Sequence, residues 1–541
     1  MRQILLYDTT LRDGMQGENI NFSAEDKIRI ARVFDDFGIH YIEGGWPGSN
    51  PKDLRFFQLA REIDFQHARL TAFGATRKSG VPVEQDQNVK LLIESGAPAV
   101  AVVGKTWDLH VTEIMNNSLD ENLAMIRDTV TYLKKHDLEV FFDAEHFFDA
   151  YARNPAYALA ALSAAAGAGA DALVLCDTNG GSLPEDIERA TRAVGDELNA
   201  SGKGDGIKIG IHTHNDSGLA VANSLAGIRA GADMVQGTIN GYGERCGNAD
   251  LTAIIPILCL KMGYPCMSPE NLKKLKKVSR FVSETANITP LSSRPFVGRS
   301  AFCHKGGLHV SAIMRNPVAY EHIDPELVGS NRRVVVSDLA GKSNILYKAR
   351  EMGIDVDALG ADTGRIVSEI KLMEEDGYQF DAADGSFKIL MEKITGHFRP
   401  LFELKSFRVI IEKNHDQPCA AQAMIKIAVD NVEAITAAEG DGPVSALDNA
   451  LRKAIAEFYP ESLGLDAMHL VDFKVRVLDG RDGTSAKVRV LIDSRDEDEV
   501  WSTIGVSEDI IEASWQALAD SCQYKLAKEL STKKLKNTEK P

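Results

Sequence analysis

The hydrophobic positions in the first half of the chain alternate between two spacings. Short runs rich in β-branched and aromatic residues are separated by longer segments in which apolar residues recur every three or four positions. The short runs predict buried β-strands, and the longer segments predict amphipathic helices that cover them. We expect eight strands, at residues 4–7, 41–43, 69–73, 99–103, 139–142, 172–175, 207–211 and 234–236.

These units have the size and order of a TIM barrel. Gly96, Gly169 and Gly231 stand where a helix gives way to the next strand, as expected for a glycine at a helix C-terminus. Eight strand–helix units in about 250 residues favour a (β/α)8 barrel. A doubly wound open sheet is the alternative, but no glycine-rich phosphate loop follows the first strand. The clearest helices are expected at residues 23–37, 119–133 and 184–198.

The pattern changes twice beyond the barrel. Helical stretches at 272–285, 342–352 and 361–376 alternate with irregular segments, which predicts a linker with small helical subdomains. From residue 402 strands lead twice to an amphipathic helix, which favours an α+β domain with an internal duplication of a ββα unit. Its strands are expected at 407–411, 423–429, 472–478 and 486–492, and its helices at 445–459 and 509–529. We therefore expect a catalytic barrel (1–271), a linker with helical subdomains (272–400), a C-terminal α+β domain (401–530) and a basic tail (531–541).

Composition narrows the classes of function. The 541 residues are 44% apolar and 26% charged, as in a folded soluble protein. The 61 Lys and Arg against 78 Asp and Glu give a net charge of −17, which opposes nucleic-acid binding. The seven cysteines contain no CxxC pair, as expected of a reduced, cytoplasmic protein. No signal peptide and no membrane-spanning run is evident.

Polar residues collect directly after the expected strands, where a TIM barrel carries its active site. His212 and His214 are the strongest signal, because side chains at positions i and i+2 of a strand point to the same face. Asp13, after the first strand, is the carboxylate expected as a third ligand. Two imidazoles, one carboxylate and open positions suit a divalent cation such as Mg, Mn or Zn. Three other histidines lack this setting and are expected to be structural: His40, His67 and His136.

Three more residues at this rim are candidates for chemistry. Arg12 could hold a carboxylate or stabilise an oxyanion, or could form only a salt bridge to Glu43 or Asp177. Glu145 could act as a base if partial burial raises its pKa, or could support Arg12 or a histidine. Thr178 could donate its hydroxyl to a substrate carboxylate, or could cap the next helix.

Several motifs carry a family resemblance. Residues 8–14 (DTTLRDG), 212–216 (HTHND) and 241–248 (GYGERCGN) resemble the DRE-TIM metallolyase superfamily. Residues 303–309 (CHKGGLH) resemble the HKxGxH segment of its Claisen-condensing branch, the 2-isopropylmalate, homocitrate and citramalate synthases. The stretch from Phe402 is similar to the effector-binding domain of that branch. Residues 43–51 (EGGWPGSNP) and 376–380 (DGYQF) are typical of one group of (R)-citramalate synthases.

The resemblance implies an acyltransferase that condenses acetyl-CoA with pyruvate to (R)-citramalate and CoA in isoleucine biosynthesis, with feedback by isoleucine at the C-terminal domain. The alternatives are 2-isopropylmalate synthase and homocitrate synthase. It also implies a homodimer in which His309, with Tyr320, reaches the active site of the other subunit. At the barrel it implies metal ligation by Asp13, His212 and His214 with Asn248 as a further or water-mediated ligand, binding of the 2-oxo acid by Arg12 and Thr178, and acid–base work or water positioning by Glu145.

Two hypotheses from other classes remain. A metal-dependent hydroxyacyl-CoA lyase on the same barrel would cleave its substrate and would not need the residues after Pro400. A catalytically inactive sensor would bind ligand only in the C-terminal domain. The intact set Arg12, Asp13, His212 and His214 argues against the sensor.

Overall fold

The structure, a computed structural model, describes residues 2–202, 206–335, 342–351, 363–413, 415, 419–459, 464–478, 486–496 and 499–538. The chain forms two compact units. The first comprises Met1–Phe302 and Ile323–Arg332, and the second Cys303–His322 and Arg333–Pro541. Within the described part of the chain, no helix has both the length and the apolar content that a membrane crossing needs.

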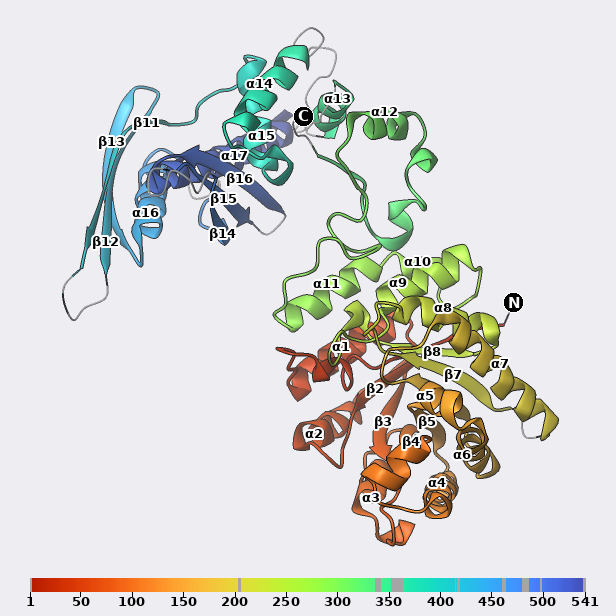
Figure 1. Cartoon of the computed structure of the whole chain (residues 1–541). Helices are drawn as coiled ribbons and strands as arrows, with labels where there is room; N and C mark the ends of the chain where they lie inside the picture. The colour runs from red at the N-terminus through yellow and green to blue at the C-terminus, as the bar shows by residue number, and fades with distance from the viewer. Residues whose placement is uncertain are drawn as a thin grey trace. The chain divides into compact units, whose positions relative to one another are not determined.

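Eight parallel strands form a closed barrel in the first unit (Figure 1). The barrel closes where β1 pairs with β8, from Leu5 opposite Met234 to Asp8 opposite Gly237. This closure confirms the predicted TIM barrel and excludes the open sheet. The strands are β1 (Leu5–Asp8), β2 (Tyr41–Gly45), β3 (Arg69–Ala75), β4 (Ala99–Lys105), β5 (Glu139–Glu145), β6 (Ala172–Asp177), β7 (Lys208–Thr213) and β8 (Met234–Gly237).

Both faces of these strands are buried, which explains their continuous apolar runs. Phe141 packs inside the barrel, whereas the adjacent Phe142 packs outward against the helices. Inside, the ring of Phe141 makes edge contacts with Tyr7 and Tyr41, at centroid distances of 5.7 and 5.0 Å. This aromatic layer fills the barrel, so the residues that follow it along β1, β2 and β5 face the mouth.

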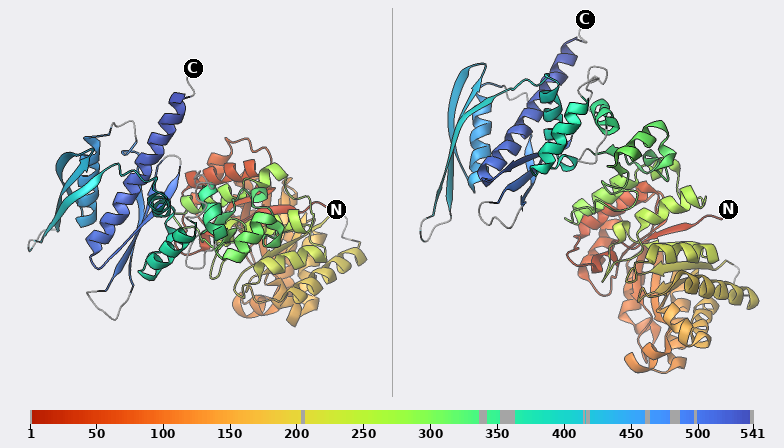
Figure 2. Two further views of the ribbon diagram at one scale, coloured as in Figure 1. Left: turned by 90° about the horizontal axis from the view of Figure 1, so that it is seen from above. Right: turned by 45° about the horizontal axis from the view of Figure 1, so that its top comes forward.

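Helices surround the barrel (Figure 2). Ser23 and Asp26 close a reciprocal capping box at the start of α1, and Gly96, Gly169 and Gly231 take positive φ angles of 75°, 94° and 126° before the next strands. The helix expected at 272–285 is wrong in extent, because a turn at residues 273–274 separates α10 from α11. The helices of this unit are α1 (Ala24–Phe37), α2 (Pro51–Ala60), α3 (Gln87–Glu94), α4 (Leu119–Lys134), α5 (Phe147–Arg153), α6 (Pro155–Gly167), α7 (Pro184–Ala200), α8 (Ala220–Ala230), α9 (Leu251–Pro256), α10 (Pro269–Leu272) and α11 (Leu275–Thr285).

The second unit begins with short strands and four helices. The strand β9 (Cys303–His304) pairs in parallel with β10 (Arg333–Val334). The expected helices at 342–352 and 361–376 are confirmed over their described residues, and α15 was not expected. Ile366, Ile370, Phe380 and Phe387 build a separate small core here. The helices are α12 (Gly307–Arg315), α13 (Lys342–Glu351), α14 (Thr363–Glu375) and α15 (Asp384–Ile394).

The C-terminal part is a duplicated α+β fold. Each repeat is a three-stranded antiparallel sheet followed by a helix, so the expected ββα unit is wrong by one strand per repeat. The missed strand β13 contains Ala, Glu and Gly that weaken its sequence pattern, whereas the missed strand β16 is rich in Val, Trp, Thr and Ile. The first repeat comprises β11 (Glu403–Glu412), β12 (Ala420–Val429), β13 (Val432–Gly440) and α16 (Pro443–Ala456); the second comprises β14 (His469–Val477), β15 (Val488–Arg495), β16 (Val500–Ser507) and α17 (Ile510–Thr538).

The two repeats differ in how their sheets are covered. The helix α16 packs on one face of the first sheet, and exposed residues such as Met424 and Ile435 line the other. The second sheet packs against α17, and Ile504 and Leu491 also contact the core that contains α15. The strands β15 and β16 of the second repeat are therefore covered on both faces, although β14 exposes residues such as Val475, whereas the first sheet is covered on one face.

Candidate active site at the barrel mouth

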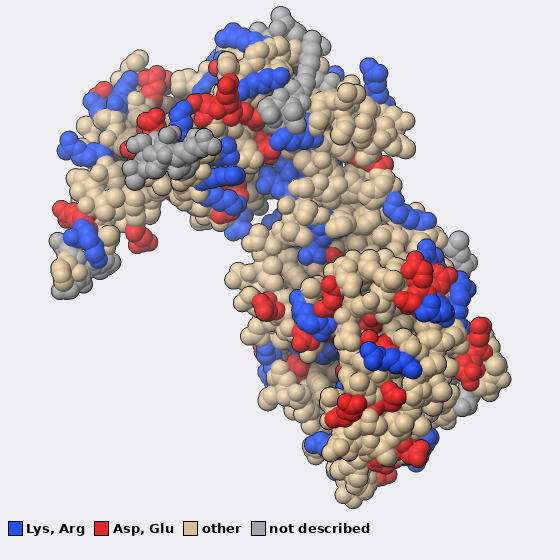
Figure 3. All heavy atoms as spheres, in the orientation of Figure 1, with Lys and Arg blue, Asp and Glu red and all other residues tan. Residues whose placement is uncertain are grey.

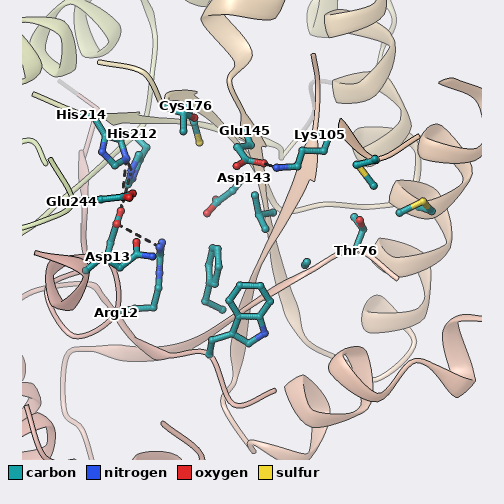
Figure 4. A pocket seen from close by; sticks show the side chains of 18 of the residues that line it. Arg12, Asp13, Thr76, Lys105, Asp143, Glu145, Cys176, His212, His214 and Glu244 are labelled. Atoms are coloured by element: carbon teal, nitrogen blue, oxygen red, sulfur yellow. Dashed lines mark hydrogen bonds and ion pairs between the residues drawn. The ribbon is translucent and has the colours of Figure 1, made fainter. Parts of the chain in front are cut away.

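A cavity of about 650 Å³ opens at the carboxyl ends of the barrel strands (Figure 4). Charged, aromatic and sulfur-containing side chains line it. The predicted residues that line it are Arg12, Asp13, Glu145, Thr178, His212 and His214, and further lining residues include Trp46, Phe73, Lys105, Asp143, Cys176, Glu244 and Arg245.

Asp13, His212 and His214 converge in this cavity. The two histidine Nε2 atoms are 3.2 Å apart, and an Asp13 carboxylate oxygen lies 3.3 Å from His212 Nε2 and 4.0 Å from His214 Nε2. All three residues are buried. Among the described His, Cys, Asp and Glu residues, this is the one group of three whose ligand atoms lie close enough to hold a metal ion. The structure thus brings together the three side chains that the sequence predicts as metal ligands.

The electrostatics of this cluster suit a divalent cation. Burial alone would raise the pKa of the Asp13 carboxyl group. The charges of Arg12 and the two histidines, with the hydrogen bond to His212, outweigh burial and hold this pKa well below its usual range. Burial and the neighbouring His212 lower the pKa of His214 to about 4, so its imidazole is neutral. The Nδ1 atom of His212 lies 3.0 Å from Gln236 Oε1, which fixes the ring and leaves Nε2 to face Asp13 and His214. An anionic carboxylate and converging imidazole nitrogens form a donor set for a metal.

Asn248 lies beside this cluster. It forms an isolated β-bridge with His214, and its amide nitrogen donates to the Tyr242 carbonyl at 3.1 Å. Its Oδ1 atom is buried and has no hydrogen-bond partner in the described structure, and the same holds for His214 Nδ1. Because buried polar atoms are rarely left unpaired, Oδ1 is a candidate to accept from a bound water or to bind a cation. Gly243 makes room for the amide, since a Cβ there would meet Asn248 Nδ2 at 2.1 Å.

Arg12 is held rigidly at the wall of the cavity. Its Nε donates to Glu43 at 2.5 Å, and Glu43 also accepts from the Tyr7 hydroxyl at 2.7 Å. The guanidinium stacks over Phe73, 3.9 Å from the ring centroid. Of the two partners considered for a structural salt bridge, Glu43 and Asp177, Arg12 pairs with Glu43. Arg12 nevertheless keeps nitrogen atoms at the cavity, where its Nη1 lies 3.5 Å from Asp13.

Glu145 and Thr178 also line the cavity, and the two residues differ in the partners that hold them. Glu145, at the end of β5, forms an ion pair with Lys105 at the end of β4 (Figure 4). The Thr178 hydroxyl oxygen accepts from the His146 backbone N–H at 2.9 Å, so it does not cap the helix that follows, α7. That accepted bond leaves the Thr178 hydroxyl proton available to donate to a ligand.

Several lining residues are not among the predicted catalytic, substrate-binding or metal-binding residues. Lys105 gave no signal, because its partner Glu145 lies on another strand. Asp143 lies two residues before Glu145 on β5 and therefore shares its face. Burial, with the charge of Glu43, raises the pKa of Asp143 to about 7, and its Oδ1 has no partner in the described structure. Trp46 and Phe73 meet edge to face at 5.3 Å and form the apolar wall.

His309 and Tyr320 belong to the second unit. Their rings stack at a centroid distance of 4.3 Å, and Tyr320 is 47% exposed. The structure thus brings these two predicted residues together, and their role at the barrel stays a prediction. Figure 3 shows acidic and basic side chains interspersed over the surface of the barrel on this face. The net charge of −17 is thus not gathered there in one patch.

Nearly the whole chain matches known proteins. Residues 3–287 match the family described as HMGL-like, residues 296–377 the homocitrate synthase post-HMGL domain-like family, and residues 381–526 the LeuA allosteric (dimerisation) domain. The chain is 51% identical to an (R)-citramalate synthase of Aquifex aeolicus, over 97% of this chain and 98% of that protein. It is 52% identical to an (R)-citramalate synthase of Geobacter sulfurreducens over 98% of each.

More distant matches include other activities. A probable 2-isopropylmalate synthase of Methanopyrus kandleri is 32% identical over 95% of this chain and 97% of that protein. Among solved structures, the HMG-CoA lyase of Bacillus subtilis is 21% identical, covers 54% of this chain and 97% of its own, and has a TM-score of 0.45.

Proposed function

The chain belongs to the HMGL-like family and, within it, to the (R)-citramalate synthases, and from this premise we propose that it condenses acetyl-CoA with pyruvate to form (R)-citramalate and CoA. The observation that carries the proposal is full-length likeness, from 44% to 52% identity with five (R)-citramalate synthases. Two matching 2-isopropylmalate synthases, one of them a probable one, reach only 30% and 32%.

We assign the divalent metal to Asp13, His212 and His214, with Asn248 as a further or water-mediated ligand. The fit rests on the convergence of the three side chains and on the unpartnered Asn248 Oδ1. When bound, the cation would polarise the keto oxygen of the 2-oxo acid. The same residues suit Mg, Mn or Zn.

Arg12 and Thr178 would hold the 2-oxo acid. The guanidinium of Arg12 is fixed by Glu43 and Phe73, so it can bind a carboxylate without losing much side-chain freedom. The Thr178 hydroxyl would donate to the same carboxylate. Because Arg12 is prepositioned, it would also stabilise the negative charge that develops on the keto oxygen during carbon–carbon bond formation.

The proton transfers would fall to Glu145 and the stacked pair His309 and Tyr320. A base removes a proton from the acetyl-CoA methyl group, the resulting carbon attacks the keto carbon of pyruvate, and the keto oxygen takes a proton. Water then cleaves the thioester and releases CoA as a thiol. Glu145 is held by Lys105 beside the cavity, and we assign it to acid–base work or to the positioning of this water. His309 and Tyr320 would come from the other subunit of a homodimer.

The cavity wall favours a short 2-oxo acid without a second charge. Trp46 and Phe73 are bulky and meet edge to face, and so they restrict the space for a branched side chain. Asp143 adds an acidic group at the wall, and Lys105 is already paired with Glu145. A second substrate carboxylate beside Asp143 would meet an acidic group and a lysine that already has a partner, which disfavours 2-oxoglutarate at this part of the wall.

We assign regulation to the C-terminal domain, which would bind isoleucine and lower turnover. The match to the LeuA allosteric (dimerisation) domain supports an effector site and a dimer, and the choice of isoleucine follows from the proposed product. The lyase alternative is disfavoured because this domain would then have no role.

Product analysis tests the activity directly. The purified protein is incubated with acetyl-CoA, pyruvate and Mg²⁺ or Mn²⁺. The released CoA is quantified with a thiol reagent, and the citramalate enantiomers are separated on a chiral column. We expect one (R)-citramalate for each CoA. CoA release without citramalate, or cleavage of a hydroxyacyl-CoA in place of condensation, would rule the proposal out.

A further inference from the structure

Two cysteines on the outer layer of the barrel unit lie in direct contact. Cys259 belongs to the π-helical segment η5 (Ile257–Lys261), and Cys266 lies in the turn before α10. Their Sγ atoms are 2.9 Å apart. Neither cysteine lines the cavity at the barrel mouth, so the proposed reaction makes no use of them.

The backbone of the intervening turn holds the two thiols together. The Met262 N–H donates to the Ile257 carbonyl and the Tyr264 N–H to the Leu258 carbonyl, both at 2.9 Å. Gly263 takes a φ of +71°, which lets the chain reverse between these two bonds. The folded backbone thus already provides the close approach that a disulfide needs.

The two thiols have unequal surroundings, which sets an order of reaction. Cys259 is half-buried, whereas Cys266 is only 3% exposed and belongs to the core. The contact with the Cys266 thiol lowers the pKa of Cys259, and the N–H groups of Cys266 and Met267 act in the same direction against the effect of burial. Cys259 is thus the more accessible and more acidic nucleophile.

We propose that Cys259 and Cys266 form a reversible disulfide through exchange with a low-molecular-weight disulfide such as oxidised glutathione. The Cys259 thiolate attacks one sulfur of the external disulfide, breaks its S–S bond and releases the first thiolate. Cys266 then loses its proton, attacks the Cys259 sulfur and releases the second thiolate. The protein loses two protons and two electrons, and the external disulfide is reduced to two thiols.

The disulfide would join the outer layer at the end of the barrel remote from the mouth. The helix α9 follows β8 and runs back along the barrel, so η5 and the turn after it lie towards the amino ends of the strands. Arg2, which precedes β1, supports this placement because its guanidinium lies 6.0 Å from the Tyr264 ring. Oxidation should therefore leave turnover unchanged and make the barrel unit harder to unfold by heat.

Peptide mapping of the full-length protein tests the site. The protein is equilibrated with oxidised glutathione, free thiols are blocked by alkylation, and the chain is cut with trypsin. Cleavage after Lys261 places the two cysteines in separate peptides, residues 246–261 and 262–273. We expect these peptides to be joined, lighter by two hydrogens than the separate pair, and to separate when a reductant is added.

Three serine variants identify the sulfurs involved. Cys259→Ser and Cys266→Ser should each abolish the linked peptides, whereas Cys246→Ser, which removes the exposed cysteine of the same peptide, should keep them. Oxidation should raise the thermal midpoint of wild type and Cys246→Ser alone and change turnover by less than twofold. Complete alkylation of both cysteines after oxidation, a mixed glutathione adduct on Cys259 that does not close, or survival of the link in Cys266→Ser would overturn the proposal.

Discussion

The barrel mouth and the C-terminal sheets use β-structure in opposite ways. The barrel has no free edge, its strands are buried on both faces, and its charged residues line the cavity at its mouth. The C-terminal sheets have only three strands each, and the first exposes Ile410, Met424 and Ile435 on the face that α16 does not cover. Catalysis gains from fixed charges in a water-poor site, whereas assembly and control need surface that can still be covered.

The two C-terminal repeats also differ from each other, because contacts with the helical subdomain are made by the second. In the second repeat, Arg489 on β15 donates to the Gly377 carbonyl and to Gln379, each at 2.6 Å, and the Tyr378 hydroxyl donates to Gln516 on α17 at 3.1 Å. The segment 376–380 thus ties the second sheet to the helical subdomain. The first repeat has the same strand order without such a cover. We therefore expect effector binding and dimer contacts to depend more on the first repeat.

Among the predictions for the barrel and the C-terminal sheets, removal of a metal ligand should have the largest effect on turnover. We expect His212→Ala to lower turnover by about 10³-fold or more and to weaken binding of Mn²⁺, because the cavity loses one of three converging ligands. The unfolding midpoint should stay close to wild type. His67→Ala, at an exposed histidine, is the matched control and should leave turnover intact. Full activity in His212→Ala would remove the metal assignment.

The second test concerns the geometry of Arg12. We expect Arg12→Lys to lower kcat/KM for the 2-oxo acid by about 10²-fold, because lysine keeps the charge but cannot hold both Glu43 and a carboxylate with one planar group. Steady-state kinetics with pyruvate varied and acetyl-CoA saturating would measure this. Near-wild-type kinetics would show that Arg12 serves only its salt bridge with Glu43.

The pH dependence of metal binding should give a smaller, graded effect. Burial opposes a charge on His212, but the hydrogen bond and charge of Asp13 outweigh it and raise the pKa of His212. A ligand histidine must be deprotonated, so the apparent affinity should fall by about tenfold per pH unit below this raised pKa and level off above it. Calorimetric titration with Mn²⁺ across this range checks the sign. An affinity that does not change with pH would contradict it.

The smallest expected effect lies in the C-terminal domain. Isoleucine titrated into the full chain should lower turnover by about fivefold, with leucine weaker. Ile435→Glu on the open face of the first sheet should reduce this inhibition and leave turnover without isoleucine within about twofold. Val475→Glu, at an exposed position on β14 of the second sheet, is the matched control. Loss of inhibition in Val475→Glu alone would reverse the assignment of the two repeats.

The barrel was more predictable from the sequence than the rest of the chain. Strands buried on both faces leave continuous apolar runs, and the i and i+2 spacing of His212 and His214 is enough to predict that both side chains face the same cavity. The strand β13 escaped because Ala, Glu and Gly weaken its pattern, whereas β16 contains Val, Trp, Thr and Ile and could have been predicted from its own residues. The pairing of Lys105 with Glu145 and the contact of Cys259 with Cys266 were not predictable, because they depend on how neighbouring strands or a turn bring the side chains together.

The most direct test of the central claim is the choice of 2-oxo acid. CoA release is measured with wild-type protein, acetyl-CoA and either pyruvate, 2-oxoisovalerate or 2-oxoglutarate. The wall of Trp46, Phe73 and Asp143 predicts the highest kcat/KM with pyruvate and little turnover with the other two. Turnover with 2-oxoisovalerate alone would contradict the account and make the enzyme a 2-isopropylmalate synthase.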